Sequence, residues 1–114
     1  AFALTTDSSV LTAWSNDYGF ETVFARQVQA LAVPGDLLWG LSTSGRSPNL
    51  LRAFETARAR GCGTVALLGR DGGPLAALCD SCAVVPLEDT AAIQAAHLLS
   101  YHAICAHLDR CFAE

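Results

Sequence analysis

The sequence has no methionine and little charge, because only 16% of its 114 residues are Asp, Glu, Lys or Arg. The formal net charge is −4 and no run of Lys or Arg occurs, which excludes direct nucleic-acid binding through a broad basic face. No apolar stretch approaches the ~20 residues that span a bilayer, and no signal peptide is visible. We therefore predict a cytoplasmic protein that contacts neither membrane nor nucleic acid.

The sequence also lacks the cysteine spacing of a zinc-binding module. Its five cysteines include one CxxC pair, Cys79 and Cys82, and no second pair that a structural zinc site would need. That pair leads into an apolar strand pattern, whereas a redox CxxC usually opens a helix. We predict that all five are small buried hydrophobic residues of a protein in a reducing compartment.

Apolar residues are plentiful, at 52% of the chain, which is enough for a core in a single domain. It is also more than a small monomer needs, so we expect part of it to be buried between subunits. The missing methionine and the apolar start at Ala1 indicate that the chain begins part-way through a longer protein.

Hydrophobic periodicity predicts strands alternating with helices. The short apolar runs predict strands at residues 1–5, 37–41, 64–68 and 81–85. Amphipathic spacing predicts helices at 20–31, 48–60, 74–78 and 90–112, with a brief helical turn near 11–14 and a loop at 15–19. This alternation predicts an α/β fold with a parallel sheet, whose ligand lies beyond the carboxyl ends of the strands. Three loops are expected to meet there, at 5–9, 42–47 and 69–73.

One loop carries a cluster of hydroxyl residues directly after an apolar run expected to be buried on both faces, Leu37 to Leu41. The cluster consists of Ser42, Thr43, Ser44 and Ser47, around Gly45. Pro48 suits the first position of a helix, which makes Ser47 its N-cap. Free amides at a helix start and the helix dipole attract anions, so this loop predicts a phosphate site. An ordinary serine-capped turn is the alternative, and the Gly-Lys-Ser/Thr ending of a Walker A loop is absent.

The last predicted helix is apolar over most of its circumference, which is typical of a helix buried on more than one side. Packing against the sheet and against another subunit would satisfy it. It carries three histidines: His97, on the apolar stripe, and His107, near the end, are interpreted as structural. His102 has two open interpretations, packing within the helix or chemistry at a site.

Several stretches together resemble phosphoheptose isomerases, a family of sugar isomerase (SIS) domains. The matching stretches are Leu4-Thr5-Thr6-Asp7, Asn16-Asp17-Tyr18-Gly19-Phe20, Ser42-Thr43-Ser44-Gly45, Gly69-Arg70-Asp71-Gly72-Gly73, and Ile93-Gln94 with His97 and His102. The resemblance implies a three-layer αβα sandwich with a parallel sheet, flavodoxin-like. Residues 1–114 would form the carboxy-terminal portion of a longer SIS domain, incomplete at its amino-terminal side.

The resemblance also implies an activity: isomerisation of sedoheptulose 7-phosphate to D-glycero-D-manno-heptose 7-phosphate, by a zinc-assisted homotetramer with active sites at subunit contacts. The implied phosphate ligands are Ser42, Thr43, Ser44 and Ser47. Asn16 and Asp17 would contact the sugar, and Gln94 would contact both substrate and metal. His102 would be a metal ligand and the catalytic acid/base.

The chain departs from the family pattern in three respects. The family's Gly-Asn-Gly-Gly-Ser turn and the helix that carries a further His and Glu are not in this sequence. Ala95 stands where Glu is common, and Arg46 where Asn is common. These departures keep open an alternative from another class, a non-catalytic SIS-domain binding protein of the DnaA initiator-associating type.

Overall fold

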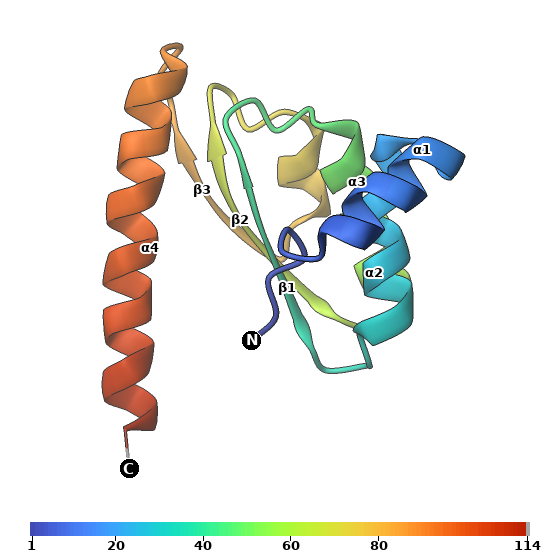
Figure 1. Cartoon of the computed structure of the whole chain (residues 1–114). Coiled ribbons are helices and arrows are strands. Elements are labelled where there is room, and N and C mark those ends of the chain that lie inside the picture. Colours follow the sequence, from blue (N-terminus) through green and yellow to red (C-terminus); the bar gives the residue numbers. More distant parts are fainter. Residues whose placement is uncertain (114) are drawn as a thin grey trace.

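The computed structural model describes residues 1–113 and shows a parallel three-stranded sheet between two layers of helices. The strands are β1 (Leu37–Ser42), β2 (Gly63–Gly69) and β3 (Ser81–Val85), in the order β1-β2-β3. The helices are η1 (Val10–Trp14), α1 (Ser15–Tyr18), η2 (Phe20–Thr22), α2 (Val23–Leu31), α3 (Pro48–Ala59), η3 (Pro74–Leu78) and α4 (Thr90–Phe112). Figure 1 shows α4 on one face of the sheet and α3 with η3 on the other. The predicted α/β fold with parallel strands is confirmed.

The core lies between the sheet and α3. Phe54 of α3 is fully buried against Ala66, Leu68 and Leu75. Gly40 of β1 makes this packing possible, because a Cβ there would lie 2.7 Å from the Phe54 ring. A sheet residue without a side chain lets the aromatic ring rest on the strand itself.

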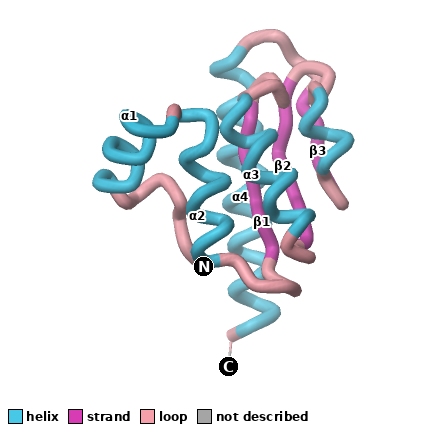
Figure 2. The backbone as a smooth tube through the Cα atoms, turned by 90° about the vertical axis from the view of Figure 1, so that its right-hand side faces the viewer, coloured by secondary structure: helices cyan, strands magenta, loops and turns pink. Residues whose placement is uncertain are grey.

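A second cluster joins α2 to α3, the two helices that lie side by side in Figure 2. Val28 of α2 packs on Ala53 and Ala57 of α3 and on Cys62, just before β2. The small alanines allow the two helix backbones to approach closely. Leu4 packs against the same cluster, which fixes the start of the chain near the amino-terminal end of β2.

Two sequence predictions near the start of the chain are wrong. Residues 1–5 form no strand; instead, the Leu4 carbonyl accepts a hydrogen bond from Gln27 Nε2 at 3.0 Å. Residues 15–18 are helical rather than a loop, because Tyr18 stacks on Trp14 one turn earlier, with ring centroids 4.2 Å apart. The helix ends where Gly19 takes φ +89°.

The cysteines are less buried than predicted. Cys62 is buried and Cys79 is half-buried, whereas Cys82, Cys105 and Cys111 are exposed; all five are free thiols. Burial raises the pKa of Cys79 to about 11, with smaller contributions from Cys82 and Asp80 nearby. That pKa disfavours the thiolate and argues against a redox role for the CxxC pair.

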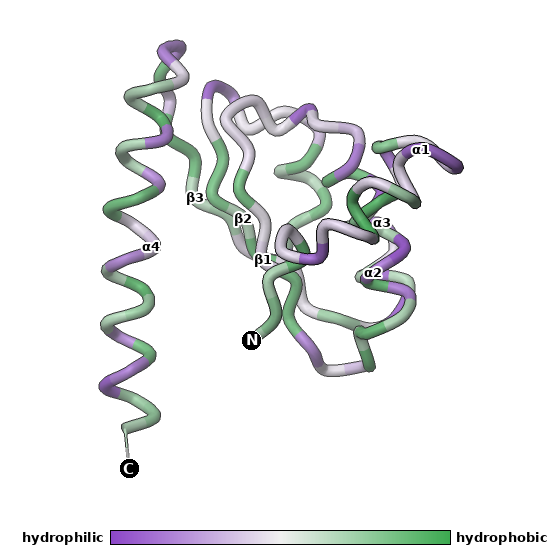
Figure 3. The backbone as a smooth tube through the Cα atoms, viewed as in Figure 1, coloured by the Kyte–Doolittle hydropathy of each residue, from purple (hydrophilic) through white to green (hydrophobic). Residues whose placement is uncertain are grey.

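The sheet face towards α4 is more open than predicted. Leu37 and Leu41 of β1 are 63% and 47% exposed, so this strand is not buried on both faces. Only Ile93 and His97 of α4 are buried, and Figure 3 shows hydrophobic colour continuing down the helix where no other element covers it. The large exposed apolar residues of α4 are Leu98, Leu99, Ile104, Leu108 and Phe112. Despite this apolar character, no helix within residues 1–113 is long and apolar enough to cross a bilayer.

Candidate functional site

The hydroxyl loop lies at the carboxyl end of β1, as the sequence predicted. Strand β1 pairs in parallel with β2, with Ser42 opposite Leu68, so the loops after both strands leave the same edge of the sheet. The expected third loop is not there: Figures 1 and 2 both show residues 5–9 well below that edge. Two loops, 42–47 and 69–73, therefore form the edge of the candidate site.

Serine side chains shape the loop from within. The Oγ atom of Ser42, which is buried, accepts a hydrogen bond from the Gly45 amide at 3.0 Å and lies 3.3 Å from Ser47 Oγ. The Ser44 Oγ accepts a hydrogen bond from the Arg46 amide at 3.2 Å. These bonds turn the chain tightly around Gly45 and gather the hydroxyls in front of the next helix.

Helix α3 begins as predicted, with Ser47 as N-cap and Pro48 in the first turn. One detail differs: the Ser47 side chain makes no capping bond, and its carbonyl accepts from the amides of Leu50 and Leu51 instead. Within residues 1–113, the amides of Ser44 and Ser47 donate to no protein group. Free amides, free hydroxyl hydrogens and the amino end of a 12-residue helix converge there, which is the arrangement that holds a phosphate.

The two loops are in backbone contact. Gly45 has φ +62°, and a Cβ on it would lie 1.8 Å from the Gly72 carbonyl oxygen. A Cβ on Gly73 would lie 2.6 Å from the Gly45 carbonyl oxygen, which accepts a hydrogen bond from the Leu75 amide at 3.1 Å. Only glycine allows this approach, so the glycines of the second loop hold the first loop in place.

An ion pair also joins the two loops. The Arg46 guanidinium donates to both carboxylate oxygens of Asp71, at 2.6 and 2.7 Å. The hydrogen bonds from Arg46, and from the Gly73 amide, hold the pKa of Asp71 well below its ordinary range. The same contact raises the pKa of Arg46. Both side chains are about half exposed or more, so the pair lies on the surface of the loops.

A pocket of about 420 Å³ opens between the end of β1 and α4. It is lined by Leu41, Ser42, Thr43, Gln94, His97, Leu98 and Tyr101. Helix α4 comes this close because Gly69 has no side chain, and a Cβ there would lie 2.7 Å from Ile93. The structure thus brings Gln94 together with two of the predicted phosphate ligands.

His97 also lines this pocket, a position that the sequence analysis did not assign to the site. It is buried, and its Nε2 lies 2.9 Å from the Leu68 carbonyl oxygen, so the structural interpretation also holds. Its i+3 spacing from Gln94 was the available signal, because residues three apart share a helix face.

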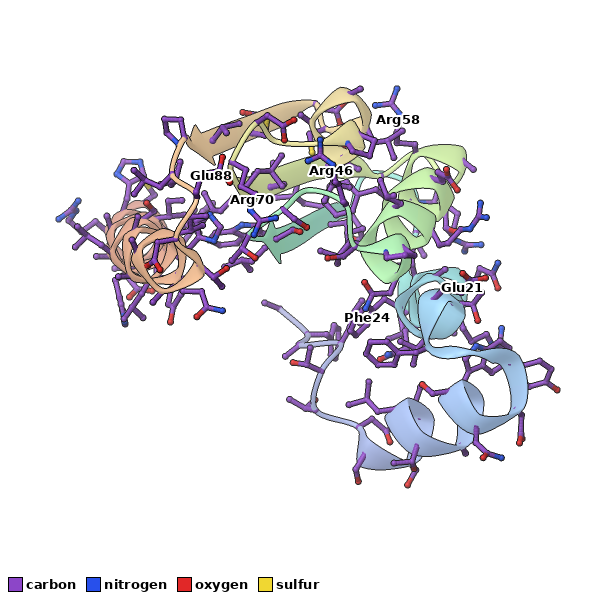
Figure 4. The ribbon with its side chains drawn as sticks, turned by 90° about the horizontal axis from the view of Figure 1, so that it is seen from above. Glu21, Phe24, Arg46, Arg58, Arg70 and Glu88 are labelled. Carbon is purple, nitrogen blue, oxygen red and sulfur yellow. The ribbon has the colours of Figure 1, made fainter. Side chains whose placement is uncertain are left out.

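The remaining predicted site residues lie elsewhere. His102 is exposed, outside the pocket lining, with its ring 4.9 Å from that of Tyr101. Asn16 and Asp17 are exposed on α1 and hydrogen-bond to each other at 2.9 Å. Figures 1 and 4 place α1 and α4 at opposite ends of the molecule. One chain therefore does not bring Asn16 or Asp17 to Gln94, and their roles stay predictions.

Comparisons with known proteins identify the family to which this chain belongs. The family model described as "SIS domain" matches residues 1–69, which is more than half of the chain. This chain belongs to the SIS-domain family. A phosphoheptose isomerase of Trichlorobacter lovleyi is 53% identical over 105 residues, covering 92% of this SIS domain and 54% of the relative. A phosphoheptose isomerase from Nitratiruptor sp. is 54% identical over 112 residues, covering 98% of this SIS domain and 60% of the relative.

Solved structures agree with the sequence relatives. The phosphoheptose isomerase GmhA of Neisseria gonorrhoeae superimposes with a TM-score of 0.93 at 50% identity, over 96% of this SIS domain and 62% of that chain. A phosphoheptose isomerase from Francisella tularensis gives the same TM-score at 40% identity. The chain spans a little over half the length of the curated relatives it matches.

The described residues of this SIS domain do not by themselves fit a zinc ion. Residues 1–113 contain no group of three or more His, Cys, Asp or Glu side chains placed to hold a metal. Gln94 and His102 lie two turns apart on α4, a rise of about 12 Å. A zinc ion binds nitrogen ligands at about 2.0–2.1 Å, so a single ion meets both residues only if their two side chains lean towards each other.

Proposed function

We propose that this SIS domain is part of a phosphosugar isomerase that converts sedoheptulose 7-phosphate to D-glycero-D-manno-heptose 7-phosphate for heptose precursor biosynthesis. The observation that carries the proposal is the hydroxyl loop at the amino end of α3, whose Ser42 and Thr43 line one pocket with Gln94. Relatives about half identical to this chain that are named phosphoheptose isomerase support the same activity.

In this proposal the hydroxyl loop binds the phosphate. Ser42, Thr43, Ser44 and Ser47 supply hydroxyls, and the free amides supply further donors. Because no lysine or arginine is needed at a helix start, phosphate binding is compatible with the low content of basic residues. The loop holds the same end of substrate and product, so it contributes to affinity more than to the chemical step.

The chemistry takes place at the other end of the sugar. A base removes a proton from C1 of the ketose, an enediol forms, and a proton returns to C2, while the C1 hydroxyl proton passes to the C2 oxygen. This shift needs an acid/base and stabilisation of the developing oxyanion. We assign the proton transfer to His102 and sugar contacts to Gln94, Asn16 and Asp17. Histidine suits this role because its ordinary pKa lies near neutrality.

We also propose that the working protein is a homotetramer with its active sites at contacts between copies. The support is physical: the exposed apolar residues of α4 and β1 need a partner, and Asn16 and Asp17 lie far from Gln94 within one chain. Sedimentation velocity on the complete protein tests this, with four times the chain mass expected. A monomeric turnover-competent protein would contradict it.

A zinc cofactor and a cytoplasmic location complete the proposal. Zinc is supported by the presence of Gln94 and His102, and its other ligands have to come from outside the described residues of one copy. Metal analysis of the purified complete protein tests it, and a metal-free sample that turns over at the full rate would contradict it. Five free cysteines favour the reducing cytoplasm.

The activity is tested with the complete protein and sedoheptulose 7-phosphate, with and without chelator. We expect turnover in at least one condition, and no turnover in either would contradict an isomerase. Phosphosugar binding without turnover would support the non-catalytic SIS-domain binding protein instead.

The phosphate assignment has its own test. We expect Ser44→Ala to weaken phosphosugar binding, because it removes one hydroxyl donor and the acceptor of the Arg46 amide. Loss of one hydrogen bond to a charged group corresponds to about 1.5–3 kcal/mol. Ser9→Ala is the matched control, since Ser9 is exposed at the far start of the chain. Equal phosphosugar affinity in both variants would contradict the assignment of this loop to the phosphate site.

A further inference from the structure

The ion pair between the two loops touches the phosphate loop itself. Besides its two bonds to Asp71, Arg46 donates from Nη1 to the Ser44 carbonyl at 3.0 Å. Asp71 Oδ1 in turn accepts a hydrogen bond from the Gly73 amide at 3.1 Å. Gly73 is one of the two glycines whose backbone lies against Gly45. The pair therefore fixes the main chain of both loops on either side of the contact.

We propose that Arg46 and Asp71 are positioning residues that hold the hydroxyl loop in its phosphate-binding shape. This inference rests on the proposed function of that loop. Three of the five guanidinium N–H groups of Arg46 are committed to this contact, two to Asp71 and one to the Ser44 carbonyl, which is why we assign Arg46 a positioning role. The bidentate geometry makes the pair directional, which is how an arginine and a carboxylate fix a loop.

A second ion pair continues along the same edge of the sheet but lacks these features. Arg70 Nε lies 3.7 Å from Glu88, whose side chain is 90% exposed. The pKa of Arg46 is raised mainly by Asp71 and to a smaller extent by the Glu88 charge. Figure 4 labels Arg46, Arg70 and Glu88 at this edge. The shorter, two-bonded pair is the one that reaches the hydroxyl loop.

Charge alone and loop positioning predict opposite results for one substitution. Asp71→Asn removes a negative charge beside an anion site and frees Arg46, so simple electrostatics predicts tighter phosphate binding. If Asp71 positions the loop, the same substitution weakens binding. Arg46→Gln weakens binding in both cases, and only positioning predicts that the double variant is no weaker than either single variant.

The experiment titrates the complete protein with sedoheptulose 7-phosphate by calorimetry, for wild type, Arg46→Gln, Asp71→Asn and the double variant. Arg52→Gln is the matched control for Arg46→Gln, because it breaks an exposed pair with Glu55 at 3.1 Å and changes net charge by the same amount. We expect about fivefold weaker binding in all three test variants, as for an exposed ion pair, and no change in the control. In turnover assays, KM should rise and kcat should stay nearly constant.

Tighter or unchanged binding by Asp71→Asn would overturn the proposal, as would additive losses in the double variant. Amide hydrogen exchange of residues 43–47 in the free protein gives a second readout, with faster exchange expected in each test variant and unchanged exchange in the control. Unchanged exchange in the test variants would also overturn it. A wild-type protein that binds no phosphosugar would defeat the proposed function, whereas a binding wild type with unaffected variants would defeat only this inference.

Discussion

Replacing Gly45 by alanine tests how strongly the two loops depend on each other. An alanine Cβ at this position would lie 1.8 Å from the Gly72 carbonyl oxygen and 2.4 Å from its carbon, and both atoms are backbone. No side-chain rotation relieves such a contact, so one loop has to move. The movement also breaks the hydrogen bond from the Leu75 amide to the Gly45 carbonyl.

The expected loss of stability has three parts. A residue other than glycine at φ +62° costs about 1–2 kcal/mol. The lost hydrogen bond costs about 1 kcal/mol, and forcing the packed backbones apart costs roughly 1–3 kcal/mol. We therefore expect Gly45→Ala to lower the free energy of unfolding by about 3–6 kcal/mol.

Gly35→Ala separates backbone strain from contact. Gly35 also has positive φ, at +94°, but a Cβ there meets nothing within 4 Å. We expect this control to lose only about 1–2 kcal/mol. Urea unfolding at a fixed protein concentration, followed by tryptophan fluorescence, measures both variants. If Gly45→Ala were no less stable than Gly35→Ala, the argument for interlocked loops would be refuted.

Three further predictions concern the frame around the site. Phe54→Ala should lower the free energy of unfolding by about 3–5 kcal/mol in urea titrations, because Phe54 is fully buried. Asp89→Ala should lower it by about 1 kcal/mol, because the Asp89 side chain caps α4 through the Ala92 amide at 2.8 Å. Hydrogen bonds from the Thr64 amide and hydroxyl lower the pKa of Asp80. Its contribution to stability is therefore complete above the unfolded pKa, near pH 4, and is lost as the pH falls through the lower folded value, so Asp80→Asn should flatten acid unfolding curves.

The parts of the fold that the sequence predicted correctly have strong local signals. Helix α4 spans the predicted residues 90–112. Its apolar pattern is unbroken along the helix, so it can be recognised without knowing what the helix packs against. Strands β2 and β3 and the helix start at Pro48 also match, because turn residues border each apolar run. Each of these signals depends on only a few neighbouring residues, and packing in the final fold leaves the resulting element in place.

The failure at residues 1–5 depends on contacts between distant residues. Residues 1–5 have a strand-like composition, yet Leu4 packs on the α2–α3 cluster and pairs with no strand. The contact of Gly45 with Gly72 and Gly73 has no sequence signal beyond the glycines themselves, which could equally mark flexible turns. The meeting of loops 42–47 and 69–73 was therefore predictable, whereas the backbone contact that holds the first loop in place was not.

The proposed phosphate binding and the proposed chemistry would depend on different levels of organisation in this SIS domain. The hydroxyl loop is shaped by bonds among its own serines and by the neighbouring glycine loop, all within one chain. The groups proposed for the sugar are spread over α1 and α4, at opposite ends of that chain. The exposed apolar faces of α4 and β1 are the surfaces through which another copy could unite them. In the proposed mechanism, affinity for the phosphate needs only the folded loops, whereas proton transfer needs His102 beside the bound sugar. Under that proposal, assembly would control turnover far more than binding.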